Sequence, residues 1–479
     1  MPPSPDNYKY GGGLSGTLLH PLVLVAMILA LVLILVLPRK YVVAPVVVLA
    51  FLAPQGQQLY LAGLHLFVLR IVVLVAFIRA WASRRPEEAR LAGGWTGIDT
   101  AFTVCTVAQG VAVMVLFHDT GAVINQFGYL WDFLLAYFAL RILIRGEEDL
   151  YFTLKCLALV TVPLAIGMII EQRSMVNIFG QLGGMSAVPE LREGKIRSQG
   201  AFEHSLMAGA FAATLVPVMF VLWRTGKGKL LGTVGLIGAT IMMWTTNSST
   251  PLLAYIAGIL ALLCWPIRKS MRPVRWGIAC TLVGLHLVMK APVWFLIARV
   301  DVTGSSSGYH RAELVDQFIH HFFDWWLLGV KDTSDWGLDM WDVQNQYVNV
   351  GETGGLLAFV FFILVISRSF GMLGDARKSV DGDKGKEWML WCLGSAMFAN
   401  VVAFFGVNYF DQSRIWWFIL LAMISAIAAP MLQGHGIAAG PLGEEKSAIQ
   451  RPWFKPRPSK SGERDVATER PGKLVPRLR

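Results

Sequence analysis

Long apolar segments recur along this chain, separated by short polar or charged stretches. Residues 22–37 carry no charged side chain and belong to a stretch that can cross the roughly 30 Å hydrocarbon core of a bilayer. About thirteen such segments are expected to span a membrane, at approximately 16–37, 41–53, 59–79, 98–117, 127–145, 151–170, 204–222, 230–246, 250–266, 276–296, 354–368, 387–405 and 414–431. The pattern predicts an all-α fold: a polytopic membrane bundle of about 12–13 transmembrane helices over residues 16–431.

Composition supports a membrane protein. Hydrophobic residues make up 55% of the chain and charged residues 15%, whereas soluble domains carry roughly 25% charged residues. A soluble enzyme, a secreted disulfide scaffold and a disordered regulator are therefore excluded. The five cysteines lie in apolar segments and form no Cys-x-x-Cys pair, which argues against a disulfide framework and a zinc site.

The distribution of lysine and arginine indicates the orientation. Basic stretches follow the odd-numbered segments, whereas the connections after most even-numbered segments, such as "TTNSST", are nearly free of basic residues. Because basic loops stay in the cytoplasm, residues 1–15 are predicted to be periplasmic and the basic tail 432–479 cytoplasmic. The tail accounts for half of the net charge of +10, so its predicted partner is anionic lipid rather than nucleic acid.

Two long connections on the predicted periplasmic side, residues 171–203 and 297–353, break this pattern. Long loops inside a compact bundle are usually functional or disordered. The second loop is rich in tryptophan and phenylalanine, and residues 309–323 have the apolar spacing of an amphipathic helix. A folded element at the membrane interface is therefore expected there.

Basic residues in these two loops are the first candidates for chemistry. Arg192, Lys195 and Arg197 cluster in the first loop, and Arg311 lies in the amphipathic segment of the second. Guanidinium groups bind phosphate oxygens with paired hydrogen bonds, so arginines at the outer leaflet suit a lipid diphosphate. Ordinary ion pairs or snorkelling side chains are the alternative interpretation.

Three short segments resemble the O-antigen ligase and polymerase superfamily of bacterial envelopes. They are "RSQGAFEHSLMAGAFAATL" (197–215), "YHRAELVDQF" followed by "WWLLGV", and "QNQYVNVGETGGLLAFVFFIL" (344–364). Their order and their predicted face agree with that family. The resemblance implies that Arg197 and Arg311 hold the diphosphate of a polyprenyl-linked glycan. It also implies that Asn345, Tyr347 and Glu352 belong to the end of the large loop, and Arg192 lies beside the matched motif.

One position departs from the family. Ligases carry a histidine just before the asparagine, where it is thought to help activate the acceptor hydroxyl, and this chain has Gln344. An amide cannot accept a proton as a base, although it can orient a hydroxyl. The candidate bases are Asp342, His310 and Glu352. Two mechanisms stay open: the reaction needs no base and Gln344 orients the acceptor, or Asp342 takes the proton.

The resemblance implies a membrane glycosyltransferase that polymerises, or ligates, polyprenyl-diphosphate-linked oligosaccharides on the periplasmic face of a bacterial inner membrane, for exopolysaccharide or O-antigen production. Its expected partners are a lipid-linked glycan donor, a glycan or lipid acceptor, membrane lipids and other polysaccharide-assembly proteins. No cofactor is expected, because the donor is already activated. No metal site is expected at His320–His321, because adjacent helical side chains diverge. Two alternatives remain: a transporter or flippase for a lipid-linked or anionic substrate, and an inactive scaffold in an envelope-assembly complex.

Overall fold

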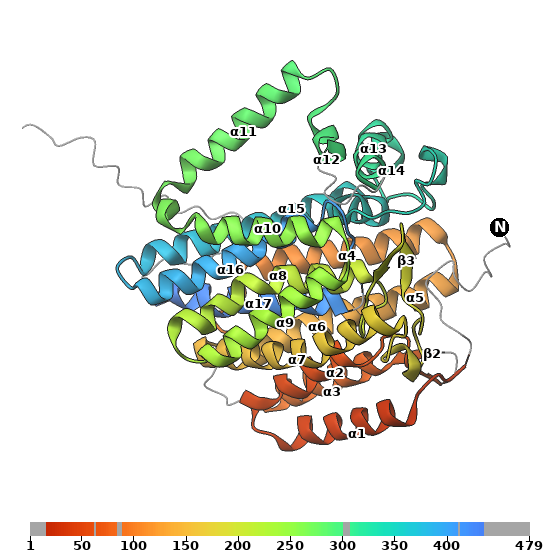
Figure 1. Cartoon of the computed structure of the whole chain (residues 1–479), viewed down its shortest axis with the longest axis vertical. Helices are drawn as coiled ribbons and strands as arrows, with labels where there is room; N and C mark the ends of the chain where they lie inside the picture. Colours follow the sequence, from red (N-terminus) through yellow and green to blue (C-terminus); the bar gives the residue numbers. More distant parts are fainter. Residues whose placement is uncertain (1–15, 62–63, 84–88, 300–306, 411, 435–479) are drawn as a thin grey trace, which may run out of the picture. The chain divides into compact units, whose positions relative to one another are not determined.

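The computed structural model describes residues 16–61, 64–83, 89–299, 307–410 and 412–434, which form a bundle of α-helices (Figure 1). The helices are α1 (Pro21–Val36), α2 (Val43–Leu52), α3 (Val68–Ala82), α4 (Gly97–Phe117), α5 (Thr120–Leu130), α6 (Ala136–Leu143), α7 (Glu147–Ser174), α8 (Ser205–Thr225), α9 (Lys229–Thr245), α10 (Ser249–Leu263), α11 (Met271–Val288), α12 (Leu296–Arg299), α13 (Ser307–His320), α14 (Phe322–Trp325), α15 (Gln346–Ser379), α16 (Lys384–Ala403) and α17 (Gln412–Gly434). The predicted all-α bundle is confirmed, and every predicted segment overlaps a helix.

Several of these helices are long and apolar enough to cross a membrane. By length and composition, five described helices qualify, namely α4, α7, α8, α15 and α17, and the bent pair α10–α11 is a sixth candidate. The helices α1 and α9 are apolar but shorter. The described helices therefore have the length and composition expected of a multi-pass membrane protein. The predicted N-terminal segment 1–15 and nearly all of the tail, residues 435–479, lie outside the described residues.

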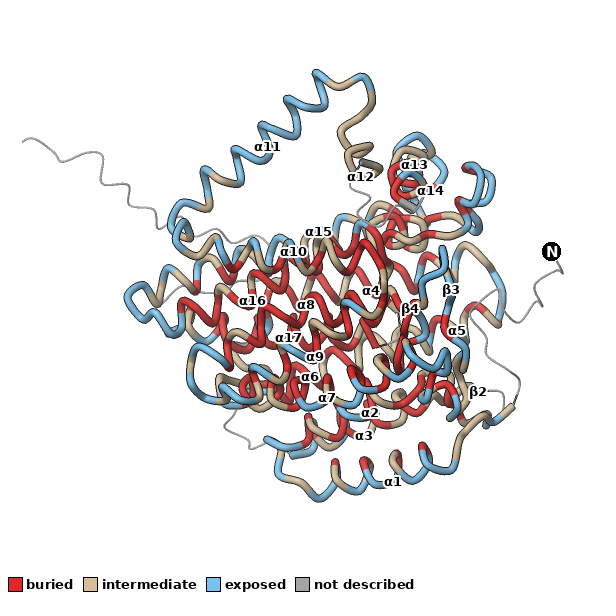
Figure 2. Tube along the Cα trace, in the orientation of Figure 1, coloured by how far each residue is buried: buried red, intermediate tan, exposed pale blue. Residues whose placement is uncertain are grey.

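Two helices form the centre of the bundle. In the most apolar 18-residue stretch of α8 and of α17, 89% of the residues are buried, whereas in the corresponding stretch of α4 and of α15 only 39% are buried. Figure 2 shows the same difference along these helices. Trp416 of α17 is fully buried, and its indole nitrogen donates to Thr214 Oγ1 of α8 at 2.8 Å. By contrast, α1 exposes Leu22, Val25 and other apolar side chains on its outer face. Apolar residues on both faces are typical of a helix between protein and lipid.

The connections between helices separate into two groups. The predicted basic connections gather at one end of the bundle, which we call the basic end. There, Arg39 pairs with Asp149 at 3.0 Å and Arg268 pairs with Glu387 at 2.8 Å. The opposite end, called the loop end, holds residues 53–61, 64–67, 171–204, 245–250, 326–345 and 404–410, and Figure 1 shows β2, β3, α13 and α14 there.

Two small antiparallel hairpins lie at the loop end. The first pairs β1 (Gln58–Leu61) with β2 (Leu64–Phe67), and the second pairs β3 (Glu190–Arg192) with β4 (Lys195–Arg197). The first corrects the prediction of a span over 59–79, because residues 59–61 and 64–67 are strands and α3 begins only at Val68. The leucines of these strands alternate with Gln58, Tyr60 and His65, but the long apolar run that continues from Val68 hid this short strand signal in the prediction.

Other predicted segments differ in detail. A π-helical stretch, Trp131–Leu135, joins α5 to α6 inside the predicted span 127–145. The predicted span 354–368 is the middle of the longer α15, which is kinked at Gly355. The amphipathic segment 309–323 is helical, as predicted, and forms α13 and the start of α14. The predicted span 276–296 is α11, which ends at Val288 and has no buried residue (Figure 2).

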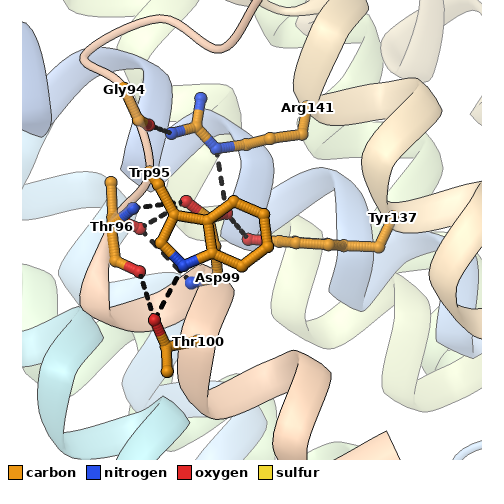
Figure 3. A network of polar contacts seen from close by, with 7 residues as sticks. All are labelled: Gly94, Trp95, Thr96, Asp99, Thr100, Tyr137 and Arg141. Atoms are coloured by element: carbon orange, nitrogen blue, oxygen red, sulfur yellow. Dashed lines mark hydrogen bonds and ion pairs between the residues drawn. The ribbon is translucent and has the colours of Figure 1, made fainter. Parts of the chain in front are cut away.

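A fully buried ion pair joins α4 to α6 near the basic end (Figure 3). Asp99 forms a capping box with Thr96 at the start of α4, which satisfies backbone donors of the first turn. Its other oxygen accepts hydrogen bonds from Tyr137 at 2.6 Å and from Arg141 Nε at 3.2 Å. Arg141 also donates to the carbonyl of Gly94. Both charged side chains are 0% exposed. Removing either one would leave the other charge buried without a partner, which is strongly destabilising.

Candidate functional site

Arg197 is the last residue of strand β4 and is held from two sides. Its cross-strand neighbour is Glu190, and Arg197 Nη1 lies 3.2 Å from both carboxylate oxygens of Glu190. From the other side, Nη2 donates to Ser248 Oγ at 2.9 Å. The side chain is only 7% exposed. The short hairpin therefore aims the guanidinium at the residue that precedes helix α10.

The loop after Arg197 is anchored on the end of α7. The Glu171 carboxylate accepts the backbone N–H groups of Gln199 and Gly200 at 3.0 and 2.9 Å. Asn177 Nδ2 donates to the Gly200 carbonyl, and Ser198 N–H donates to the Thr245 carbonyl. Gly200 has φ +61°, a conformation that glycine adopts at little cost. These contacts hold Arg197 in place relative to the α9–α10 connection.

Arg311 lies on α13 and approaches the start of helix α10. Its side chain is buried, with 7% of the residue exposed. A Cβ added to Gly406 would lie 3.1 Å from Arg311 Nε and would overlap Thr250 Oγ1. Both side chains therefore pack against the backbone of Gly406, in the connection between α16 and α17. Arg311 thus reaches the first turn of α10, as Arg197 does.

The two arginines and the start of α10 form one cationic region, which we call the arginine site. Arg197 bonds the N-cap residue Ser248, and Arg311 lies beside Thr250 in the first helical turn. A helix N-terminus carries partial positive charge and unpaired backbone N–H groups, so it favours a bound anion. Two guanidinium groups at the same place reinforce that preference.

Several buried donors between Arg197 and the start of α8 have no partner among the described residues. They are Arg197 Nε, Gln199 Nε2 and the Ser205 hydroxyl. A buried polar atom without a hydrogen bond costs about 1–3 kcal/mol. Three such atoms within nine residues of sequence are consistent with a ligand that supplies acceptor oxygens. A diphosphate group has the required acceptors.

A second group of predicted residues meets beside Arg311. His310 Nε2 lies 3.2 Å from the carbonyl oxygen of Asp342, and Gln344 Nε2 donates to Asp342 Oδ2 at 2.6 Å. All three residues are half-buried. The structure therefore brings together three of the predicted catalytic and binding residues from two distant segments of the chain.

Asn345 and Tyr347 have structural contacts. Asn345 is the N-cap of α15, where its Oδ1 accepts the N–H groups of Tyr347 and Val348. Its Nδ2 donates to the carbonyl of Phe405, and the Tyr347 hydroxyl donates to the carbonyl of Val401. These bonds fix the 404–410 connection, and with it Gly406, against the start of α15.

The remaining predicted residues, Glu352 and Arg192, make other contacts. The Glu352 carboxylate accepts from Asn349 at 3.1 Å on α15 itself, and its backbone carbonyl accepts the N–H of Val330. Arg192 lies in strand β3 opposite Lys195, at the turn of the hairpin, and is half-exposed. The structure does not join either residue to the arginine site by a contact among the described residues.

Sequence reasoning missed the groups that complete the arginine site. Ser248, Thr250, Gly406 and Glu171 were not singled out, although "TTNSST" was recognised as an uncharged connection. A serine before a helix is an N-cap signal, and this signal could have pointed to the start of α10. Nothing in the sequence places Gly406 beside Arg311, or Glu171 against the loop that follows Arg197.

Within the part of the chain that the structure describes, no group of three metal-ligating side chains is found. His320 and His321 pair separately with Asp316 at 3.4 Å and Asp324 at 2.7 Å, on the same helical segment. Comparison with known proteins does not identify a relative: no family model matches the chain, and no curated protein sequence matches it.

Proposed function

We propose that this protein is a membrane glycosyltransferase that acts on a polyprenyl-diphosphate-linked oligosaccharide. The observation that carries the proposal is the convergence of Arg197 and Arg311 on the N-terminus of α10. Two buried guanidinium groups and a helix dipole at one place suit a dianionic or more highly charged ligand. Their position at the loop end, where the chain has its long connections, suits a substrate with a large polar glycan.

The chemistry follows from the leaving group. An acceptor hydroxyl attacks the anomeric carbon of the donor, the bond from that carbon to the phosphate oxygen breaks, and the electron pair stays on the diphosphate. Fixed cations aimed at the developing charge stabilise this transition state. A direct displacement inverts the anomeric configuration. The lipid diphosphate is the only activated group that the reaction needs.

The same proposal sets the orientation in the membrane. We place the loop end in the periplasm and the basic end in the cytoplasm of a bacterial inner membrane, with about thirteen spans, a periplasmic N-terminus and a cytoplasmic tail. The gathering of basic connections at one end supports this orientation. The donor and a glycan or lipid acceptor are the substrates, and membrane lipids and other polysaccharide-assembly proteins are the partners.

Within this class, we propose a polymerase for exopolysaccharide or O-antigen rather than a ligase, because Gln344 stands where a ligase carries histidine. The deciding experiment uses the full-length protein, purified and reconstituted in lipid nanodiscs. The host's lipid-linked oligosaccharide is added, and the products are separated by gel electrophoresis. A ladder of longer lipid-linked glycans is expected. Intact donor after incubation, together with its movement across the bilayer in proteoliposomes, would support a flippase and contradict the proposal.

A further inference from the structure

A polar cluster with exposed aromatic rings lies next to the arginine site. The cluster consists of His310, Asp342 and Gln344, which are joined by contacts of 3.2 and 2.6 Å. Tyr309 precedes His310 and is 60% exposed, and Trp341 precedes Asp342 and is 61% exposed. Trp341 therefore adjoins these polar groups through Asp342, and Tyr309, whose ring centroid lies 6.2 Å from that of Phe295, precedes His310 on α13.

The contact with Asp342 determines which nitrogen of His310 holds the proton. A carbonyl oxygen can only accept, so the neutral ring donates Nε2–H to it, and Nδ1 keeps its lone pair. Among the described residues, Nδ1 has no hydrogen-bond partner. Gln344 is also oriented: its amide nitrogen donates to Asp342 Oδ2, and its Oε1 remains available to accept a hydroxyl proton.

This combination suits a sugar. One face of a sugar ring presents C–H groups that pack on an aromatic ring, and its edge presents hydroxyl groups that need donors and acceptors. Exposed Tyr309 and Trp341 supply the aromatic surface, and His310 and Gln344 supply the acceptors. His310 and Arg311 are consecutive residues of α13 whose side chains point about 100° apart, so a sugar bound by His310 lies across this helix from the arginine site.

We propose that Tyr309, His310, Trp341 and Gln344 form the subsite for the terminal sugar of the acceptor glycan, with His310 Nδ1 as the general base. This inference rests on the proposed glycosyltransferase function. The acceptor oxygen forms its bond to the anomeric carbon of the donor while its proton moves to His310 Nδ1. The bond to the diphosphate oxygen breaks, and its electron pair stays on the diphosphate beside the arginines. In this arrangement, His310 on α13 takes the role of the histidine that ligases carry at the position of Gln344.

Binding of the glycan tests the subsite without requiring turnover. The probe is the oligosaccharide repeat released from the host's lipid-linked intermediates by mild acid, and its binding to the protein in nanodiscs is measured by saturation-transfer NMR. Trp341→Ala is expected to weaken binding by roughly fivefold or more. Trp326→Ala, at another exposed tryptophan of the same loop, is the matched control and is expected to bind like wild type. Equal binding by Trp341→Ala and wild type would overturn the subsite.

Turnover of the nanodisc-embedded protein tests the base. His310→Gln can still donate to the Asp342 carbonyl but cannot take a proton, so kcat is expected to fall about 10²–10⁴-fold with little change in glycan binding. Asp342→Asn keeps an acceptor oxygen for Gln344 but removes the carboxylate as an alternative base, and its kcat is expected to fall much less than that of His310→Gln. His320→Ala, on the exposed end of the same helix, is the control. Full turnover by His310→Gln, or loss of turnover in Asp342→Asn alone, would overturn His310 as the base.

The two proposals fail in different ways. If the wild-type protein binds the oligosaccharide through Trp341 but forms no glycosidic bond from the lipid-linked donor, the glycosyltransferase proposal is wrong and the glycan subsite stands. If polymer forms normally while Trp341→Ala binds and turns over like wild type, the enzyme function stands and the subsite is wrong. Trp341 is exposed, so its replacement tests the subsite even if a variant at His310 does not fold.

Discussion

Arg197 illustrates how a side chain can be held in place by the fold and still have a donor available to bind a ligand. Its two terminal nitrogens contact Glu190 and Ser248, while Nε is buried without a partner among the described residues. Glu190 is half-exposed, with 48% of its side chain accessible. Because Glu190 lies on the solvent side, a bound phosphate group can replace it as a partner of the guanidinium. Ser248 meanwhile keeps the guanidinium at the start of α10.

Replacing either arginine is expected to abolish polymer formation. Arg197→Ala and Arg311→Ala should each leave membrane insertion intact, because neither side chain lies in the central helices. Lysine at either position should rescue poorly, since an ammonium group cannot make the paired contacts of a guanidinium. Polymer yield at matched protein level is the measurement.

Arg192→Ala is the control for this prediction. Arg192 belongs to the same hairpin but lies at its turn, so a partial effect is expected. If Arg197→Ala and Arg311→Ala both kept full polymer yield at normal expression, the arginine site would not bind the diphosphate.

At the scale of elements, the kink in α15 joins the long second loop to the bundle. Gly355 has φ +66°, and a Cβ there would lie 2.5 Å from the carbonyl oxygen of Leu327. The backbone N–H of Leu356 donates to Trp326 O, and the N–H of Val330 donates to Glu352 O. The kink therefore provides the backbone contacts that hold residues 326–330 against the bundle.

Gly355→Ala is expected to destabilise the protein by about 2 kcal/mol, because alanine is strained at positive φ and meets a backbone atom. Gly371 of the same helix is the matched control, since nothing lies within 4 Å of a Cβ added there. Gly371→Ala should leave stability unchanged or raise it by up to about 1 kcal/mol. Thermal unfolding in detergent, followed by size-exclusion chromatography, measures both. Equal unfolding temperatures would contradict the assigned role of the kink.

The buried pair Asp99–Arg141 should matter more than the ion pairs on the surface. Asp99→Ala leaves the Arg141 charge buried without its carboxylate, and the expected loss of stability is about 3–5 kcal/mol. Glu148→Ala, which removes a partner of Lys40 with an 81% exposed carboxylate, is expected to have no measurable effect. The same thermal assay compares the two variants. A small effect of Asp99→Ala would show that water or another group compensates the guanidinium.

At the scale of the whole molecule, the two ends of the bundle should face opposite sides of the membrane. Reporter fusions within 171–203 and 297–353 are expected to report the periplasm. Fusions in 224–229, 268–275 and the tail should report the cytoplasm, because the connections at the basic end carry the lysine and arginine excess. A cytoplasmic signal from 297–353 would place Arg311 on the wrong side for a periplasmic donor and would rule out the proposed reaction.

The sequence predicted much of the architecture because the relevant signals are local. The hydropathy of a segment decides whether it forms an apolar helix, and every predicted segment overlaps one in the structure. The alternation of basic and neutral connections likewise predicted which loops share an end. Local patterns failed where one apolar run contained two structures, as in the hairpin that precedes α3.

The arrangement of the candidate site depended on tertiary structure. Sequence reasoning selected Arg197 and Arg311 and expected both at the same end, but their common neighbour was not predictable. Arg197 meets Ser248, 51 residues later in the chain, and Arg311 meets the Gly406 backbone between two other helices. Such contacts depend on how the helices pack, and a pattern of apolar residues specifies only that a helix is buried, not which neighbour it meets. Composition and periodicity thus determined the helices and their sidedness, whereas packing decided that both arginines point at the start of α10.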